Sequence, residues 1–405
     1  MTLQQAELPA PGPDARAASA ALSRLIAEEI GAHGGWLSFA RYMELALYAP
    51  GLGYYAGGAH KFGDHEAGGD FLTAPELTPL FAAALARQVA QVIAASSPQV
   101  IEAGAGSGRL AADLLTALAA MDCLPERYRI LELSGELRAR QQATLAARAP
   151  QFADRVEWLD ELPENFSGCL VGNELLDAMP THALRWSAEG GAPAILERGV
   201  GIADGQLTGV ERPATGALLA AAEALGIRAP YRGEISLAAR AWVAELARRL
   251  ERGALLLIDY GLPRHELYYP LRDGGSLRCH YRHRVHDDPF WYPGLSDITS
   301  HVDFTAVAEA GFDAGLDVLG FTSQANFLLN CGIGDLLAAS KVMRSGIPWD
   351  GAGDTASADD LRARGAVNVL ISPNEMGELF KVIALGRGVP GPLLGFARAD
   401  RVHAL

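Results

Sequence analysis

The sequence predicts an α/β fold in which a largely parallel β-sheet carries helices on both faces. From residue 99 onward, short apolar runs alternate with helical patterns, and such alternation implies parallel pairing in a doubly wound sheet. A glycine-rich turn at 104–108 joins the first apolar run to a helical pattern. The chain has 405 residues, 49% hydrophobic and 20% charged, so it can bury a large core and fill two or three domain-sized units.

The elements are expected in the following order. Helical patterns cover 16–33, 38–48 and 75–95, and Ser38 is a candidate N-cap because its hydroxyl can accept from free amides of the first turn. Strands are expected at 99–103, 128–133, 156–159, 169–172, 254–259, 316–321 and 379–385. Helices are expected at 110–121, from the end of the second strand to 147, at 237–252 and at 304–310. Residues 181–236 interrupt this rhythm with alternating runs typical of antiparallel strands, and 262–302 form a long loop rich in aromatic residues and histidine.

Composition restricts the classes of function and compartment. A formal net charge of −14 disfavours nucleic acid as a partner, because that partner requires basic surface to neutralise phosphates. The four cysteines are far apart and form no Cys-x-x-Cys pair, which argues against a disulfide framework and against a cysteine zinc site. We find neither a signal-peptide pattern nor an apolar segment of membrane-span length, so we expect a soluble, cytoplasmic protein without membrane insertion.

The glycine turn is the first candidate ligand site. Its three glycines allow the backbone to approach a ligand closely, and the following helix directs its positive end toward that ligand. A dinucleotide site would need a third glycine where Arg109 stands. The pattern acid-x-Gly-x-Gly-x-Gly is instead similar to the first motif of S-adenosylmethionine (SAM)-dependent methyltransferases with a Rossmann-like fold; an ordinary turn is the alternative. The predicted SAM-binding residues here are Glu102, Gly104, Ala105, Gly106 and Gly108.

The next two strand ends carry further candidates for cofactor binding. Glu132 lies near the carboxyl end of its strand, where a carboxylate can accept from both ribose hydroxyls; the alternative is an exposed glutamate. Leu133 follows it directly. Trp158 and Leu159 end the third strand, where they flank an adenine ring or belong to the core. We therefore predict that these four side chains form the nucleoside end of the site.

The fourth strand leads into Gly172-Asn-Glu-Leu-Leu-Asp177. Ligands of a doubly wound sheet bind outside the carboxyl ends of its strands, so Asn173, Glu174 and Asp177 are expected to face the reacting group. Methyl transfer depends largely on positioning, and carboxylates can hold a guanidinium or ammonium nucleophile. We predict that Glu174 orients the nucleophilic nitrogen and that Asp177 is a second hydrogen-bond acceptor or takes up the proton. Asn173 is predicted both to bind the cofactor and to take part in catalysis. The alternative is that Glu174 caps the next helix.

Candidates for substrate binding come from the fifth strand and the loop after it. Asp259 and Tyr260 end the fifth strand, where Asp259 either shapes the substrate entrance or anchors a loop amide. His283 belongs to a histidine cluster, but the interleaved arginines would repel a metal cation, so we expect no metal and read 262–302 as a substrate loop. Asp297 and Asp303 can bind a cationic peptide, and helix capping is the alternative.

Several longer motifs resemble one family. They are Tyr42-Met43, Leu47-Tyr48-x-Pro50, Gly53-Tyr54-Tyr55, Gly69-Asp-Phe-x-Thr-x-Pro-Glu76, Glu102-x-Gly-x-Gly-x-Gly108, Glu132-x-Ser134, Asn173-Glu-Leu-Leu-Asp-Ala178, Asp259-Tyr-Gly261, Asp297-Ile-Thr299, Val302-Asp-Phe304 and Met376-Gly-Glu-Leu-Phe-Lys-Val382. Over 36–386 the chain resembles the MidA-like methyltransferases, which are related to the mitochondrial complex I assembly factor that dimethylates an arginine. The match departs at Ala105 and Ser107, where mitochondrial relatives tend to have proline and arginine.

The resemblance implies a Rossmann-like class I methyltransferase sheet with an N-terminal helical region and insertions after the fourth and fifth strands. It implies SAM as donor, S-adenosylhomocysteine as product, and a protein arginine as acceptor, with an NADH dehydrogenase subunit as a candidate partner. It also implies that Asp70 and Thr73 help to close the cofactor site. The expected units are 1–95 covering that site, 96–180 binding SAM, 181–252 as an insertion, and 253–405 completing the sheet with loop 262–302.

Two other functions stay open at this point. One is a methyltransferase for a different acceptor, such as an amide or small molecule; the other is a SAM-binding assembly chaperone without catalysis. The carboxylate pair at Glu174 and Asp177 favours catalysis, because a chaperone needs neither. The sequence leaves undecided the acceptor, the number of methyl groups, the role of 181–236 and the oligomeric state, for which a homodimer is one option.

Overall fold

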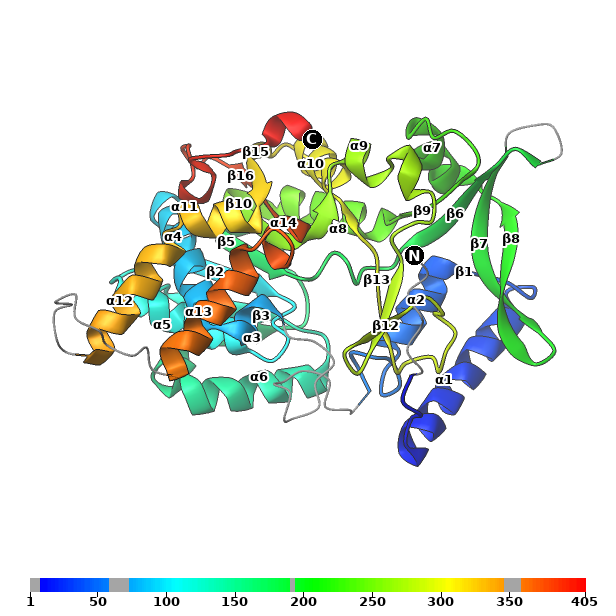
Figure 1. Ribbon diagram of the computed structural model, residues 1–405, viewed down its shortest axis with the longest axis horizontal. Helices are drawn as coiled ribbons and strands as arrows, with labels where there is room; N and C mark the ends of the chain where they lie inside the picture. The colour runs from blue at the N-terminus through cyan, green and yellow to red at the C-terminus, as the bar shows by residue number, and fades with distance from the viewer. Residues whose placement is uncertain (1–7, 58–72, 190–193, 346–357) are drawn as a thin grey trace.

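The computed structural model describes residues 8–57, 73–189, 194–345 and 358–405. Figure 1 shows two regions side by side. The larger contains the central sheet and its helices, and the smaller contains the N-terminal helices and a second sheet. A third, small sheet runs between them.

The central sheet has eight strands, seven of them in the order β15-β16-β10-β5-β2-β3-β4, with β14 paired to β10. The strands are β2 (Gln99–Ala103), β3 (Arg127–Leu131), β4 (Val156–Leu159), β5 (Phe166–Asn173), β10 (Leu250–Leu262), β14 (Val302–Asp303), β15 (Asp317–Ser323) and β16 (Phe380–Arg387). The strands from β10 to β4 are parallel, as the strand–helix alternation predicted. β16 departs from that expectation, since it lies antiparallel between β10 and β15.

Helices cover both faces of this sheet because alternate strand residues point to opposite sides. On β10, Ala254, Leu256 and Ile258 join a core with α4 (Pro79–Ala95) and α5 (Arg109–Ala120). Leu255 and Leu257 join a second core with α8 (Leu237–Arg249) and α10 (Phe304–Asp313). β10 is therefore buried on both faces, which explains its continuous apolar sequence.

The smaller region combines segments far apart in the sequence. Its antiparallel sheet has the order β1-β7-β6-β9 with β8 on β7, formed by β1 (Leu37–Ser38), β6 (His182–Ser187), β7 (Ala194–Ala203), β8 (Gln206–Pro213) and β9 (Tyr231–Ile235). α1 (Pro13–Ala32) and α2 (Phe39–Tyr48) pack against it in one core. Ser38 caps α2 as predicted, its hydroxyl accepting from the Arg41 amide at 3.1 Å. α7 (Gly216–Ala224) completes the region.

The long loop expected at 262–302 is largely structured. It contains α9 (Arg264–Leu267) and a three-stranded antiparallel sheet of β11 (Arg278–Tyr281), β12 (Arg284–His286) and β13 (Asp297–Thr299). The ring of Trp291 contacts those of Tyr281, His286 and Tyr292. The expectation of an irregular loop was wrong, because aromatic packing and the pairing of three short strands order this segment.

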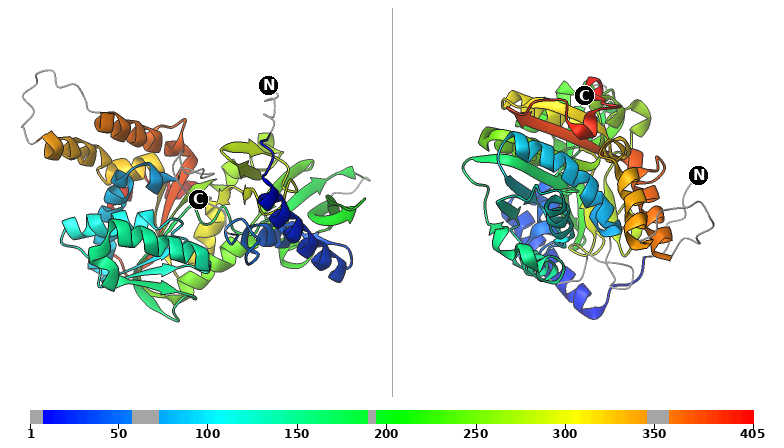
Figure 2. Two further views of the ribbon diagram at one scale, coloured as in Figure 1. Left: turned by 90° about the horizontal axis from the view of Figure 1, so that it is seen from below. Right: turned by 90° about the vertical axis from the view of Figure 1, so that its left-hand side faces the viewer.

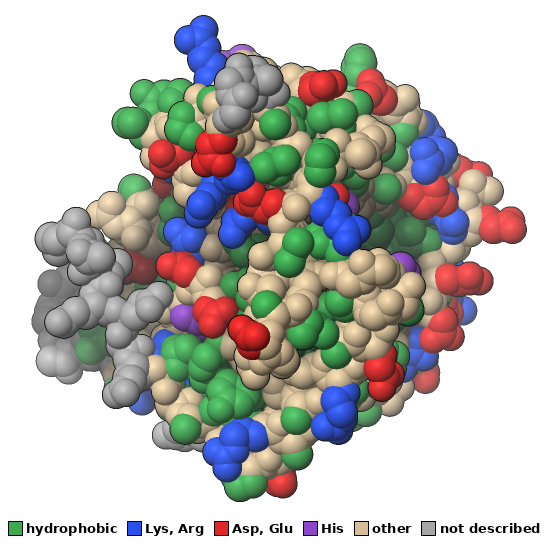
Figure 3. Space-filling model, turned by 90° about the vertical axis from the view of Figure 1, so that its right-hand side faces the viewer, with side chains coloured by type: hydrophobic (Ala, Val, Ile, Leu, Met, Phe, Trp, Pro, Cys, Tyr) green, Lys and Arg blue, Asp and Glu red, His purple; other side chains and the backbone are tan. Residues whose placement is uncertain are grey.

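Further helices complete the larger region. α11 (Gln324–Asn330) packs in the first core, and α12 (Ile333–Ser345) and α13 (Ala358–Ile371) project side by side from the body (Figure 2). Within the described ranges, every helix is too short or too polar to cross a membrane. Acidic and basic side chains are interspersed over the face shown in Figure 3.

Candidate active site

Four of the candidate segments meet at one edge of the central sheet. Ala103 pairs with Leu131 and Gly172, and Asn173 pairs with Ile258. The glycine turn, Glu132, Glu174 and Asp259 each follow one of these paired ends, so parallel pairing brings them to the same side.

The glycine turn has the backbone that its sequence requires. Gly104, Gly106 and Gly108 all have positive φ, and Gly108 begins α5. A Cβ on Gly108 would lie 2.9 Å from the Cα of Gln141, whereas a Cβ on Gly106 would meet no atom of the described residues within 4 Å. The turn is therefore closed on the side of α6 (Gly135–Arg148) and open at Gly106, as expected of a turn that receives a ligand.

The acid on the first strand is engaged inside the protein. Glu102 is buried, and Tyr128 Oη donates to its Oε2 at 2.5 Å. Burial raises the pKa of Glu102 to about 7, although this hydrogen bond opposes the shift. Ala105 is also buried, within the core beneath the turn. These two residues support the turn from within.

The nucleoside candidates are joined by a residue that the sequence did not indicate. The Nε2 atom of buried Gln141 donates to Glu132 Oε2 at 2.9 Å and to the Gly106 carbonyl at 3.2 Å, and its Oε1 accepts from Trp158 Nε1 at 3.0 Å. Leu133 has an 80% exposed side chain beside this group. The Leu159 carbonyl accepts a hydrogen bond from the Glu132 amide. The only sequence signal for Gln141 was its position four residues before a buried Leu145, on the inner face of the helix.

The turn after β5 is held by Asp259. Its Oδ2 accepts from the backbone amides of Leu175, Leu176 and Asp177 at 2.7–3.3 Å, and its Oδ1 accepts from the Tyr260 amide at 2.8 Å. These contacts match the alternative considered for Asp259, an anchor of loop amides. Glu174 does not cap this turn.

Glu174 and its neighbours retain acceptor capacity. Glu174 has φ +51°, and its Oε1 accepts from the Ala74 amide at 3.3 Å and from Asn173 Nδ2 at 3.0 Å. Among the described residues, Asn173 Oδ1 and Asp177 Oδ1 are buried without a hydrogen-bond partner. Tyr260 lies close enough to lower the pKa of Asp177, against the larger effect of burial. This end of β5 therefore presents oxygen atoms that a ligand with several donors can satisfy.

The electrostatics of this group follow from burial of several carboxylates together. Burial, and secondarily Asp177, raises the pKa of Glu174 to about 7. Burial raises the pKa of Asp177 to about 6, and the pKa of Asp259 lies well above its ordinary range because of burial and the two neighbouring carboxylates. Such a site favours a cation or a shared proton.

Segments preceding the central sheet lie against this edge. Ser107 Oγ donates to Glu76 in α3 (Ala74–Leu77). Tyr55 Oη donates to Asp297 Oδ1 at 3.0 Å, and the Tyr55 carbonyl accepts from Ser134 Oγ at 3.3 Å. Tyr48 Oη donates to the Ala178 carbonyl at 2.9 Å. Tyr48 and Tyr55 had been singled out only as parts of motifs, yet they link the cofactor candidates to Asp297.

The remaining predicted residues have other placements. Thr73 directly precedes α3, and Asp70 lies outside the described residues. His283 lies in the turn between β11 and β12 with φ +61°. No group of three or more potential metal ligands occurs in the described part of the chain.

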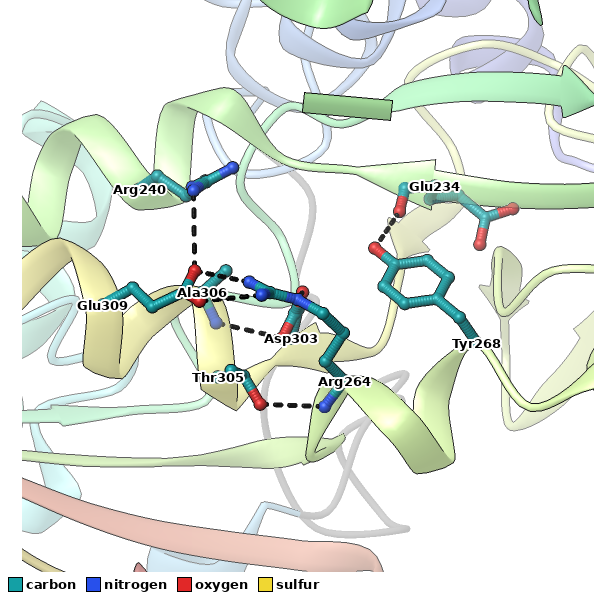
Figure 4. A network of polar contacts seen from close by, with 8 residues as sticks. All are labelled: Glu234, Arg240, Arg264, Tyr268, Asp303, Thr305, Ala306 and Glu309. Carbon is teal, nitrogen blue, oxygen red and sulfur yellow. Dashed lines mark hydrogen bonds and ion pairs between the residues drawn. The ribbon is translucent and has the colours of Figure 1, made fainter. Parts of the chain in front are cut away.

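Asp303 belongs to a separate charge network beside a cavity of about 170 Å³ (Figure 4). It caps α10 by accepting from the Ala306 amide at 3.0 Å and pairs with Arg264 at 3.3 Å. Arg264 also binds Glu309 through both terminal nitrogens. Asp303 is thus engaged in capping, the alternative considered for it.

Comparison with solved structures identifies a close structural relative. The fold matches that of a Burkholderia thailandensis protein crystallised with S-adenosyl-homocysteine, with a TM-score of 0.91 and 53% identity. The match covers 98% of this chain and 100% of the other. The cofactor is therefore S-adenosylmethionine. Within the described ranges, the open face at Gly106, the Glu132 carboxylate and the unpaired oxygens after β5 fit such a ligand.

Curated relatives correct one expectation. "Protein arginine methyltransferase NDUFAF7, mitochondrial" from Danio rerio is 28% identical and is matched over 87% of this chain and 83% of its own length. The Caenorhabditis elegans homologue is 27% identical over 74% of each chain. Both relatives are named as mitochondrial, which conflicts with the cytoplasmic localisation expected from the sequence. That expectation was wrong because it rested on absences, namely of a signal-peptide pattern and of a membrane-span segment, and these do not determine the compartment.

A family model gives the broadest statement about the chain. The model for S-adenosyl-L-methionine-dependent methyltransferases matches residues 84–322, which contain the glycine turn, Glu132, the turn after β5 and Asp259. The matched span is more than half of the chain, and it coincides with the segments that meet at the carboxyl edge of the sheet. The chain belongs to this family of SAM-dependent methyltransferases.

Proposed function

We propose that this enzyme methylates a guanidinium nitrogen of an arginine in a protein substrate, with a respiratory NADH dehydrogenase subunit as the candidate partner. The observation that carries the proposal is the group of acidic and amide oxygens after β5. Asp177 Oδ1 and Asn173 Oδ1 are buried and unpaired among the described residues, and Glu174 lies beside them. The names of the curated relatives, protein arginine methyltransferases, support the choice of acceptor.

The proposed cofactor site follows the edge of the sheet. In our proposal, the 102–108 turn holds the amino-acid end of the cofactor, Glu132 accepts from the ribose hydroxyls, and Leu133, Trp158 and Leu159 flank the adenine. Asn173 and Thr73 complete the described part of the site. When bound, SAM supplies an activated methyl group for in-line displacement. This arrangement corresponds to a Rossmann-like class I methyltransferase, with 1–95, 96–180, 181–252 and 253–405 as its proposed units.

The acceptor side has to hold a cation and remove a proton. A guanidinium presents five N–H donors in a planar fork, which suits oxygens on both Glu174 and Asp177. Since the nitrogen that receives the methyl group must lose a proton, we assign Asp177 Oδ1 as the proton acceptor. Tyr260 lies next to Asp177, and Asp259 fixes the backbone that carries both carboxylates. Asp297 and His283 are proposed to contact the rest of the substrate protein.

The proposal is tested with isotope-labelled SAM and an extract that lacks this gene. Purified enzyme is added, and labelled proteins are identified by mass spectrometry. We expect label on an arginine of one or a few proteins. Label on a small molecule, or on a different protein side chain, would assign another acceptor. Absence of any label despite SAM binding would favour the non-catalytic assembly role.

A further inference from the structure

Gln141 makes three hydrogen bonds that no motif indicated. Its side chain is fully buried on α6, and the polarity of its carboxamide is determined by its neighbours. Nε2 faces two acceptors, the Glu132 carboxylate and the Gly106 carbonyl, whereas Oε1 faces the indole N–H of Trp158. A rotated amide would place oxygen against two acceptors, so only one orientation satisfies all three partners.

The three partners belong to three separate segments. Gly106 is in the turn after β2, Glu132 follows β3, and Trp158 is on β4. The Glu132 carboxylate is held from two sides, since Oε1 accepts from the Ser134 amide at 2.8 Å and Oε2 accepts from Gln141. A carboxylate oxygen accepts more than one hydrogen bond, so both oxygens can still receive donors from a ligand.

We propose that Gln141 is the positioning residue of the nucleoside site: it sets the direction of the Glu132 carboxylate and ties it to the glycine turn and to Trp158. This inference rests on the proposed role of Glu132 in accepting the ribose hydroxyls. Gln141 acts through Glu132, so its loss weakens recognition of the hydroxyls more than it weakens other cofactor contacts. Packing supports the same role, because a Cβ on Gly108 would lie only 2.9 Å from the Cα of Gln141, so the glycine turn and α6 are in close contact at this residue.

The test compares two ligands, S-adenosylhomocysteine and its 3′-deoxy analogue, by calorimetric titration. The variants are Gln141→Leu, which removes the amide, and Gln141→Glu, which keeps its size but places a second carboxylate beside Glu132. The matched controls are Gln142→Leu and Gln142→Glu, because Gln142 is the next residue of the same helix and is exposed. Thermal unfolding without ligand shows that each variant is folded.

We expect wild type and both controls to bind S-adenosylhomocysteine about tenfold or more tightly than the analogue, as for loss of a hydrogen bond to a charged group. In Gln141→Leu and Gln141→Glu, affinity for S-adenosylhomocysteine falls by about 10- to 100-fold, while affinity for the analogue changes much less. The ratio between the ligands therefore approaches one. Should Gln141→Leu and Gln141→Glu fail to fold, Trp158→Phe removes the indole donor while keeping an aromatic ring. We expect it to lower the ratio partially, since the smaller ring beside the adenine affects both ligands alike.

Two results would overturn the inference, and they differ from each other. If wild type discriminates between the ligands and folded Gln141 variants, or Trp158→Phe in their place, retain the full ratio, Gln141 does not position Glu132. An equal loss of affinity for both ligands has the same meaning, since it reports general damage to the fold. If wild type itself binds both ligands equally, the proposed ribose contact of Glu132 fails, and the inference fails with it.

Discussion

Just beyond the last paired residues of the parallel strands β5 and β10, two carboxylates of similar burial differ in their contacts. Asp259 is 1% exposed and Asp177 is 5% exposed. Asp259 accepts from four backbone amides, whereas Asp177 Oδ1 has no partner within the described residues. A buried carboxylate whose oxygens all accept hydrogen bonds from backbone amides stabilises that backbone. A buried carboxylate with an oxygen that lacks a donor remains available to a ligand. The contrast supports our proposal that Asp259 stabilises the backbone and that the residues after β5 carry the chemistry.

The largest effect is expected where the scaffold is removed. Asp259→Ala leaves four backbone amides without their acceptor, so we expect the free energy of unfolding to fall by roughly 3–5 kcal/mol. Urea unfolding followed by circular dichroism measures this change. Asp313→Ala, at an exposed helical position, is the control and should be nearly neutral. A loss below about 1 kcal/mol for Asp259→Ala would remove the distinction between the two strand ends.

Removing a charge at the other strand end should impair the reaction with little effect on stability. Asp177→Asn keeps the size of the side chain but not its ability to accept a proton, so we expect label incorporation to fall about 10- to 100-fold. Asp154→Asn, at an exposed position, serves as the control. Equal incorporation by Asp177→Asn and wild type would show that Asp177 is only structural.

The glycine turn offers a smaller contrast of the same kind. Gly108→Ala places a Cβ against α6 at positive φ and should cost about 2–3 kcal/mol of stability. Gly106→Ala meets open space, so its cost should be near 1 kcal/mol. We expect Gly106→Ala, nevertheless, to weaken S-adenosylhomocysteine binding in titration, because that open space is the ligand side. Unchanged binding would move the cofactor away from the turn.

The smallest effect concerns pH. The pKa of Glu174 is raised to about 7 and that of Asp177 to about 6, so activity, which needs both ionised forms, should rise about fivefold between about pH 6.5 and 8. The stability that these groups contribute is complete below their ordinary pKa and is lost as pH rises through the raised values. Rates of label incorporation at saturating SAM measure the profile, and a flat profile would contradict ionisation of this pair.

The sequence predicted those parts of the fold that have strong local signals. The expected strands at 99–103 and 156–159 coincide with β2 and β4, because short apolar runs there lie between turns and helices. The orientation of β16 could not be predicted, since only tertiary packing places it between β10 and β15. The sheet at 278–299 was missed because its strands have three or four residues, too few for a visible period.

The candidate site divides in a similar way. The motifs placed the candidate segments at the carboxyl edge, where the structure brings them together. They did not distinguish Asp259, which accepts from backbone amides, from Asp177, which has an oxygen without a described partner, because tertiary structure decides which amides reach each carboxylate. Gln141 was missed since a lone glutamine on a helix resembles a surface residue. Its role appears only when three strand ends are seen together.

The most direct test of the account is the Glu174→Gln variant, measured for both S-adenosylhomocysteine affinity and label incorporation into protein arginine, with Glu161→Gln at an exposed position as control. We predict an affinity within about threefold of wild type and a loss of incorporation of about 100-fold or more, because the amide cannot hold the cationic acceptor. Full incorporation by folded Glu174→Gln would contradict the assignment of chemistry to the end of β5.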